Sequence, residues 1–258
     1  MSSTAMDEEC RRVRSLAAGL RSSVGLSASP VGVRLLSPDH EPPPGAVPLV
    51  RHRYCQAVMR ARHGHEVFLD AAGISCPAAA AAFGFRPLND NLASGRALVG
   101  FGIVSDPDVG RRRFEGMARL EPESVAGLHL FPLDHATAVP DVVVIEDLVE
   151  KLMWIALASL WVSGGSRVES TTAVLQAMCV DSTVIPFLHG RLNMGFGCYG
   201  CREATDIGPG DAALGFPGAD LAAIVDHVES LAQRAVGASR SKKAMARLSS
   251  DPWQEQGV

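Results

Sequence analysis

The chain has 258 residues, of which 47% are hydrophobic and 20% are charged, and its formal net charge is −4. This length suffices for one large domain or two closely packed lobes. The mildly acidic balance excludes the general basic field of a nucleic-acid binder, so we expect no nucleic-acid partner. The most apolar stretch, residues 152–162, is shorter than the ~20 residues of a membrane helix, and it predicts a buried helix and no membrane contact.

The N-terminus carries acidic residues ahead of basic ones and lacks the apolar run of a secretory signal, which predicts a cytoplasmic protein. In a reducing compartment the six cysteines are not expected to form a disulfide framework. Metal binding or thiol chemistry is therefore the favoured use of these cysteines.

Hydrophobic periodicity predicts helices and strands that alternate along the chain. Helices are expected over residues 8–21, 53–62, 148–162, 171–187 and 219–236. Strands are expected over residues 29–38, 66–76, 94–104, 126–133 and 140–147, the last buried on both faces. The basic run at residues 111–113 is interpreted as a solvated loop.

These elements indicate a mixed α/β fold, with α+β as the alternative arrangement. We expect one large domain built from two helix–strand–cysteine lobes. Residues 1–28 would form an N-terminal helix, residues 29–236 the cysteine-rich core, and residues 237–258 a flexible tail without chemistry.

A weak internal echo relates the two halves of the predicted core. In each half a cysteine in a helical stretch is followed by a strand and a second cysteine, with Cys55 leading to Cys76 and Cys179 leading to Cys198. Two such units would face each other across one site. Chance similarity remains an alternative, because the matches are short.

Cys76 precedes a proline and a run of alanines, in SCPAAAAAF, which predicts a helix that begins at this cysteine. Unpaired amides at a helix start favour the thiolate, the form that binds metals and attacks electrophiles. We therefore expect a lowered pKa at Cys76. The alternative is a small, buried structural thiol.

The stretch GFGCYGCREAT holds Cys198 and Cys201 as a C-x-x-C pair. Gly197 and Gly200 would let the backbone approach a bulky cofactor, and Arg202 would supply a positive charge. Glu203 and Asp206, just downstream, could act on a bound substrate or sit in the first turn of a short helix.

Three kinds of cysteine site are compatible with this pattern. A structural zinc site usually draws on two close cysteine pairs, whereas this chain has one pair and scattered single cysteines. A redox dithiol lacks here the tryptophan and proline that accompany the thioredoxin-like motif. Scattered thiolates from separate elements suit the spread corners of an iron–sulfur cluster best.

Several segments resemble the family called domain of unknown function 169, or ArCR. The resemblance covers roughly residues 29–232, and its most specific features are Cys55, the Ser75-Cys76 turn, Cys179, and Cys198-Tyr199-Gly200. It implies shared cysteine positions and no particular reaction. The family often lacks a cysteine at the position of Cys201, and it tends to carry Gln-Ala-Met where this chain has VEKLMW.

We therefore predict an iron–sulfur protein, with a 4Fe-4S cluster held by Cys55, Cys76, Cys179 and Cys198, or zinc in its place. An enzyme is favoured, one that performs reduction, elimination or sulfur transfer on a small anionic molecule, with an electron-donor protein as a partner. Cys201 and Arg202 would be the catalytic residues, the guanidinium lowering the thiol pKa. A non-catalytic metal-binding or redox-sensing module is the alternative. Cys76 and Cys198 should share one cavity.

Overall fold

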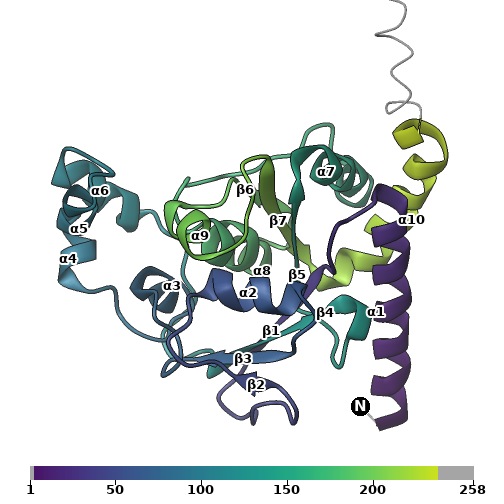
Figure 1. Cartoon of the computed structure of the whole chain (residues 1–258), viewed down its shortest axis with the longest axis horizontal. Coiled ribbons are helices and arrows are strands. Elements are labelled where there is room, and N and C mark those ends of the chain that lie inside the picture. Colours follow the sequence, from purple (N-terminus) through teal and green to yellow (C-terminus); the bar gives the residue numbers. More distant parts are fainter. Residues whose placement is uncertain (1–2, 238–258) are drawn as a thin grey trace, which may run out of the picture.

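The computed structural model describes residues 3–237, and in that part of the chain the strands form one mixed sheet (Figure 1). The sheet has seven strands in the order β2-β3-β4-β1-β5-β7-β6. All neighbouring strands are antiparallel except β2 and β3. The strand bounds are β1 Val31–Leu36, β2 Val47–Pro48, β3 Val67–Asp70, β4 Gly127–Pro132, β5 Val142–Leu148, β6 Asn193–Gly195 and β7 Asp211–Pro217. This confirms the predicted mixed α/β fold.

Helices cover both faces of the sheet and extend beyond one end of it. The α-helices are α1 Ser3–Val24, α2 Tyr54–Arg62, α3 Pro77–Ala82, α4 Asp90–Ala93, α5 Arg96–Gly100, α6 Pro107–Glu115, α7 Val149–Ser163, α8 Ile185–His189, α9 Tyr199–Ala204 and α10 Leu221–Leu231. Short 3-10 helices are η1 Leu133–His135 and η3 Gly218–Asp220, and π-helices are η2 Ala177–Val184 and η4 Ala232–Val236. In the described residues, no helix is long and apolar enough to cross a membrane.

The sheet separates two hydrophobic clusters, and β5 shows how it does so. Val142 and Val144 point into a cluster with α2, α3 and η2, whereas Val143 and Ile145 point into a cluster with α1, α7 and α10. Alternate side chains of a strand face opposite sides, so a strand buried on both sides is apolar throughout. The predicted buried strand at residues 140–147 is thus confirmed. The cysteines of interest lie on the side of α2, α3 and η2.

The strand order repeats one pattern twice. In the first half β1 pairs with β4, and β4 pairs with β3; in the second half β5 pairs with β7, and β7 pairs with β6. The halves join where β1 and β5 run antiparallel. One strand in each half is preceded in the chain by a helix and followed by a cysteine. In the first half α2 precedes β3, and Cys76 follows it. In the second half η2 and α8 precede β6, and Cys198 follows it.

Short sequence matches accompany this repeat. β4 ends at Phe131-Pro132 before the 3-10 helix η1, and β7 ends at Phe216-Pro217 before the 3-10 helix η3. The helix–strand–cysteine order expected in each half is therefore present in the fold. One continuous sheet joins the two halves, so they form one domain.

Two predicted elements are wrong. Residues 94–104, expected as a strand, contain α5, and the basic run at residues 111–113 lies in α6. α5 and α6 pack closely together where Gly95 meets Gly110. A side chain on Gly95 would lie 2.0 Å from the carbonyl oxygen of Pro107, so this approach requires glycine. Figure 1 shows α4, α5 and α6 as a separate group at the end of the molecule opposite α1. We call residues 89–115 the helical wall.

The helix expected over residues 171–187 begins later than predicted. Val174 and Gln176 have positive φ values of 65° and 56°, which interrupts any helix there. Asn193 holds the preceding loop, since its Oδ1 accepts a hydrogen bond from the amide of Thr171 at 2.9 Å. The helical part starts at Ala177 as the π-helix η2, a rare form that is frequent at functional sites. The predicted tail, apart from Gly237, lies outside the described residues.

Candidate cysteine site

Five of the six cysteines line one cavity of about 470 Å³. They come from α2, from the starts of α3 and α9, from η2, and from within α9. The five are Cys55, Cys76, Cys179, Cys198 and Cys201. The sixth, Cys10, lies buried on α1 away from this cavity. The expectation that Cys76 and Cys198 share a cavity is confirmed.

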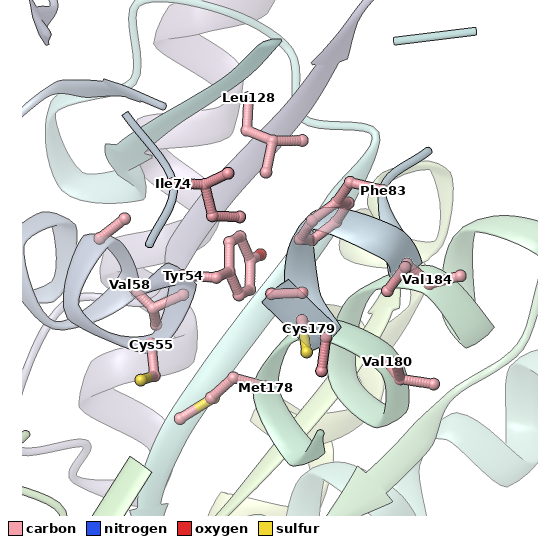
Figure 2. Packing of buried hydrophobic residues seen from close by; sticks show 14 of the residues in the cluster. Tyr54, Cys55, Val58, Ile74, Phe83, Leu128, Met178, Cys179, Val180 and Val184 are labelled. Carbon is pink, nitrogen blue, oxygen red and sulfur yellow. The ribbon is translucent and has the colours of Figure 1, made fainter. Parts of the chain in front are cut away.

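Cys55 and Cys179 approach the cavity from helices of the two halves. Figure 2 shows Tyr54 near the centre of the surrounding cluster, with Cys55 from its own helix α2 on one side and Cys179 from η2 on the other. The Tyr54 hydroxyl lies 2.8 Å from the Thr183 Oγ1, so a buried hydrogen bond joins α2 to η2. This bond fixes the two cysteine-bearing helices side by side.

Cys76 and Cys198 occupy equivalent positions in the two halves. Cys76 is the N-cap residue of α3, with Pro77 in the first turn, as the sequence predicts. Cys198 is the N-cap residue of α9. Both have the extended backbone typical of that position. The cavity therefore receives one helix-start cysteine and one helical cysteine from each half.

Cys201 is the fifth sulfur and has no cysteine equivalent in the first half. It lies three residues after Cys198, and the residue three positions after Cys76 is Ala79. Its Sγ is 3.2 Å from the Cys198 Sγ. Cys55 on α2 lines the same cavity, and α2 packs against α9, which carries Cys201.

The thiols of Cys76 and Cys179 are harder to ionise than free cysteine. Burial raises the pKa of Cys76, and the nearby amides of Ala79 and Ala78 offset only part of this effect. Burial likewise raises the pKa of Cys179, with further contributions from the other cavity thiols. The lowered pKa expected at Cys76 from its helix start is thus wrong for the metal-free protein, because desolvation outweighs the amides.

The pKa of Cys201 is about 12. Its hydrogen bond with Cys198 lowers the value, but the interaction with Cys55 and burial raise it by more. The expected lowering by Arg202 is therefore wrong. A group of neutral, buried thiols loses its protons when a multivalent cation binds, because the cation compensates for the desolvated charge.

Arg202 points away from the cavity. Its guanidinium donates hydrogen bonds to three backbone oxygens, those of Phe196, Gly208 at 2.8 Å and Asp211 at 3.1 Å. Arg202 does not line the cavity. It closes the loop between α9 and β7, a structural task that differs from the expected substrate contact.

The two glycines of the motif have different roles. Gly200 lines the cavity, where an added Cβ would lie 3.8 Å from the Cys198 Sγ. Gly197 does not line it, and its φ of +77° together with the side chain of Ile207 explains why glycine is needed there. Of the two glycines, only Gly200 therefore lies where its backbone could approach a group bound in this cavity.

Arg53 is the cavity cation that sequence reasoning missed. It is the N-cap residue of α2, and its Nη1 donates to the Gly200 oxygen at 2.9 Å and to Glu203 at 2.8 Å. Its pKa is raised, first by Glu203 and then by Cys55 and Cys76. Its place directly before Tyr54-Cys55 was the available signal.

Arg113 lies near the thiols of the second half. It donates from Nη2 to the Leu175 oxygen at 3.0 Å and to the Gln176 side chain at 2.7 Å. Burial lowers its pKa, while the carboxylate of Asp181 opposes that shift. A guanidinium thus stands near the cysteines of each half.

The thiols do not form a ready coordination site. Within residues 3–237, no group of three or more histidine, cysteine, aspartate or glutamate side chains is arranged to hold a metal ion. The cavity is nevertheless lined by five thiols and one carboxylate, that of Glu203, and such a sulfur-rich set is the kind that iron–sulfur clusters and structural zinc prefer. These side chains would have to rotate into the cavity to bind either group.

A buried acid lies beneath the far end of α2. Glu146 of β5 is 4% exposed, and its Oε1 is 3.0 Å from the Nη2 of Arg62. Burial raises the pKa of Glu146 from 4.5 to about 7, although Arg62 lowers it. The folded protein therefore holds this proton more tightly than the unfolded chain does.

This shift predicts a pH-dependent stability. The contribution of protonated Glu146 is fully present below pH 4.5 and is lost as the pH rises toward 7, because only the folded state must desolvate the carboxylate. Glu146→Gln should remove this slope, so the stability of the variant relative to the wild type should rise by about 2–3 kcal/mol from pH 4.5 to 8. Urea unfolding of both proteins across this range measures the difference. Parallel pH profiles would contradict it.

A model of the protein family described as uncharacterised ArCR, domain of unknown function 169 (DUF169), matches residues 19–227. The chain belongs to this family. The DUF169 match includes all five cavity cysteines and leaves out Cys10. Comparison with curated proteins and with solved structures finds no match.

Proposed function

We propose that this DUF169 protein binds an iron–sulfur cluster in the cysteine cavity. The observation that supports this most is the convergence of five of its six cysteines, from both halves of the fold, on one cavity. Free cysteine is often buried singly as a small apolar residue, and that use does not explain five thiols at one place. Burial, together with neighbouring thiols, raises the pKa values of Cys179 and Cys201 and favours a cation that displaces the protons.

The repeat of the fold supports a ligand set of four. Each half offers one helical cysteine and one helix-start cysteine, which gives Cys55 and Cys76 from the first half and Cys179 and Cys198 from the second. Cys201 has no equivalent in the first half, so it is the fifth thiol of the cavity and lies outside this set of four ligands. It is the thiol available to meet a substrate or to take the place of a ligand.

The nearby guanidiniums suit an inorganic group with negative charge. A cluster held by four thiolates carries a net negative charge, which Arg53 and Arg113 would offset at short range. Gly200 leaves the backbone close to the Cys198 sulfur, where peptide groups tune a bound cluster.

The cavity also has room for a small molecule beside the cysteines. Its outer side is apolar and belongs to the helical wall, with Leu92, Leu98 and Ile103 as lining residues. Arg53 supplies the positive charge that the sequence analysis attributes to Arg202. The residues therefore favour a small substrate whose anionic group faces Arg53 and whose apolar part faces the helical wall.

An iron–sulfur cluster held by four thiolates would supply electron transfer, which suits reduction, whereas a cluster held by only three of them would leave one Lewis-acidic iron open, which suits elimination or sulfur transfer. The protein's own part is to exclude water with the apolar wall, to orient the substrate with Arg53, and to present the Cys201 thiol. A reductive reaction requires an electron-donor protein as a partner.

A redox dithiol is the second candidate, supported by the 3.2 Å between the sulfurs of Cys198 and Cys201. A dithiol enzyme needs an attacking thiolate at neutral pH. Both thiols have raised pKa values, and the pKa of Cys201 is about 12. The metal-free site is therefore poorly suited to thiol exchange, and metal binding is the better use of these sulfurs.

Anaerobic purification tests the proposal. We expect a brown protein with about four irons and four acid-labile sulfides per chain and visible thiolate-to-iron charge-transfer absorption. Colourless protein with one zinc per chain would support the zinc alternative. Metal-free protein that accepts neither cluster nor zinc on reconstitution would overturn metal binding altogether.

A further inference from the structure

The cysteine site is held together by two different kinds of contact. On one side η2 packs against α3, whose sequence PAAAAA is apolar, next to Cys76 and Cys179. On the other side α2 contacts α9 and the turn after it through polar and charged side chains, next to Cys55, Cys198 and Cys201. These two sides correspond to each other in the repeat of the fold.

The polar contacts run along the whole length of α2. At its start Arg53 donates to the Gly200 oxygen at 2.9 Å and to Glu203 at 2.8 Å. One turn later the Gln56 Nε2 donates to the Ala204 oxygen at 3.2 Å. We call this set, together with the contacts at the end of α2, the α2–α9 clamp.

The far end of the clamp is an ion-pair cluster centred on Asp206. One carboxylate oxygen of Asp206 accepts a hydrogen bond from Arg62, and the other lies 2.6 Å from the His63 Nε2. Arg62 is only 9% exposed and also faces Glu146. The arginines and the histidine of the clamp therefore come from α2 and its caps, and the acidic side chains that meet them come from α9, the turn after it, and β5.

We propose that the α2–α9 clamp sets the distance between Cys55 and the C-x-x-C pair, with Asp206 as a positioning residue of the site. Asp206 lies outside the cavity, yet it fixes the end of α9 against the end of α2. Cys55 on α2 and Cys201 on α9 line the same cavity from the two sides of this contact, so loss of the clamp would separate them. The apolar side, with Cys76 and Cys179, would keep its geometry. This inference concerns the metal-free protein as well, so it does not depend on the identity of the metal.

The test uses Asp206→Asn, because Arg62→Gln would leave the buried Glu146 without its counter-charge. In the metal-free, reduced Cys198→Ser background, dibromobimane can bridge neighbouring thiols, each sulfur displacing one bromide and releasing one proton. Peptide mapping then gives the yield of the Cys55–Cys201 bridge relative to the Cys76–Cys179 bridge in the same molecules. We expect Asp206→Asn to lower this ratio by about threefold, the size expected for a pair of partly exposed ionic contacts.

Glu115→Gln is the matched control, since it removes an exposed ion pair with Arg111 on α6 that joins no two cysteine elements. It should leave the ratio unchanged. A charge-based clamp should also weaken in 1 M salt, where the ratio in the Asp206-containing protein should fall toward that of Asp206→Asn. An unchanged ratio in Asp206→Asn would overturn the inference.

A measurement of iron per chain in protein with Cys198 intact separates this inference from the proposed function. If the bridge ratio falls in Asp206→Asn but the protein never binds metal, the clamp stands and the proposed cluster does not.

Discussion

Cys198→Ser is expected to purify with iron lowered by on the order of tenfold or more, because it removes one of the four matched sulfurs from a buried site. Cys201→Ser should keep its iron and lose substrate binding or activity, since Cys201 is the sulfur without an equivalent in the first half. Iron and acid-labile sulfide per chain, measured after anaerobic reconstitution, report the first effect.

Cys10→Ser is the matched control, because Cys10 is equally a buried thiol but lies on α1 outside the cavity. It should bind iron like the wild type. Equal loss of iron in Cys198→Ser and Cys201→Ser would make Cys201 a ligand and assign the fifth position to Cys55 or Cys179. Full retention in both would remove the C-x-x-C pair from the site.

Gly215→Ala should destabilise the fold by about 2–4 kcal/mol, a large effect for a single added methyl group. Gly215 lies on β7 directly under η2, and an added Cβ would lie 1.8 Å from the backbone oxygen of Ser182. A backbone atom cannot move away as a side chain can. The π-helix would therefore lift from the sheet and carry Cys179 with it.

Urea unfolding of the metal-free protein measures this effect, with Gly116→Ala as the control. Gly116 ends α6 with a φ of −87° and has open space where a Cβ would stand. Its substitution should change the free energy of unfolding by less than about 0.5 kcal/mol. A similar small change in Gly215→Ala would show that η2 does not need this close approach.

The elements that the sequence predicts well are those decided by local pattern. The β5 strand is apolar on both faces, α2 ends near His63-Gly64, and Cys76 precedes a proline at a helix start; each of these features is visible in a few residues. The helical wall and η2 depend on contacts between distant residues instead. Gly95 meets Gly110, and Asn193 holds the loop before η2, so no local periodicity reveals them.

In the candidate site, too, some features could be predicted from the local sequence and others depend on contacts between distant residues. The cysteines could be proposed from their spacing and from the family resemblance, and the structure brings five of them to one cavity. Their ionisation could not be predicted, because burial depends on every element around the cavity and outweighs the local helix start at Cys76. The sequence favours Arg202 for a similar reason: it neighbours the motif cysteines, and only the folded chain shows that Arg53 lines the cavity and Arg202 does not.

The helical wall has a consequence for how this family can diversify. It contributes Leu92, Leu98 and Phe101 to the cavity and none of the five thiols, and it stands apart from the sheet at one end of the molecule (Figure 1). Substitutions at these lining residues would change the shape of the cavity, while the thiols come from the repeated halves alone. Under the proposed function, substrate selectivity and cluster binding would then be encoded in separate stretches of the chain, and relatives could acquire new substrates through changes in one segment.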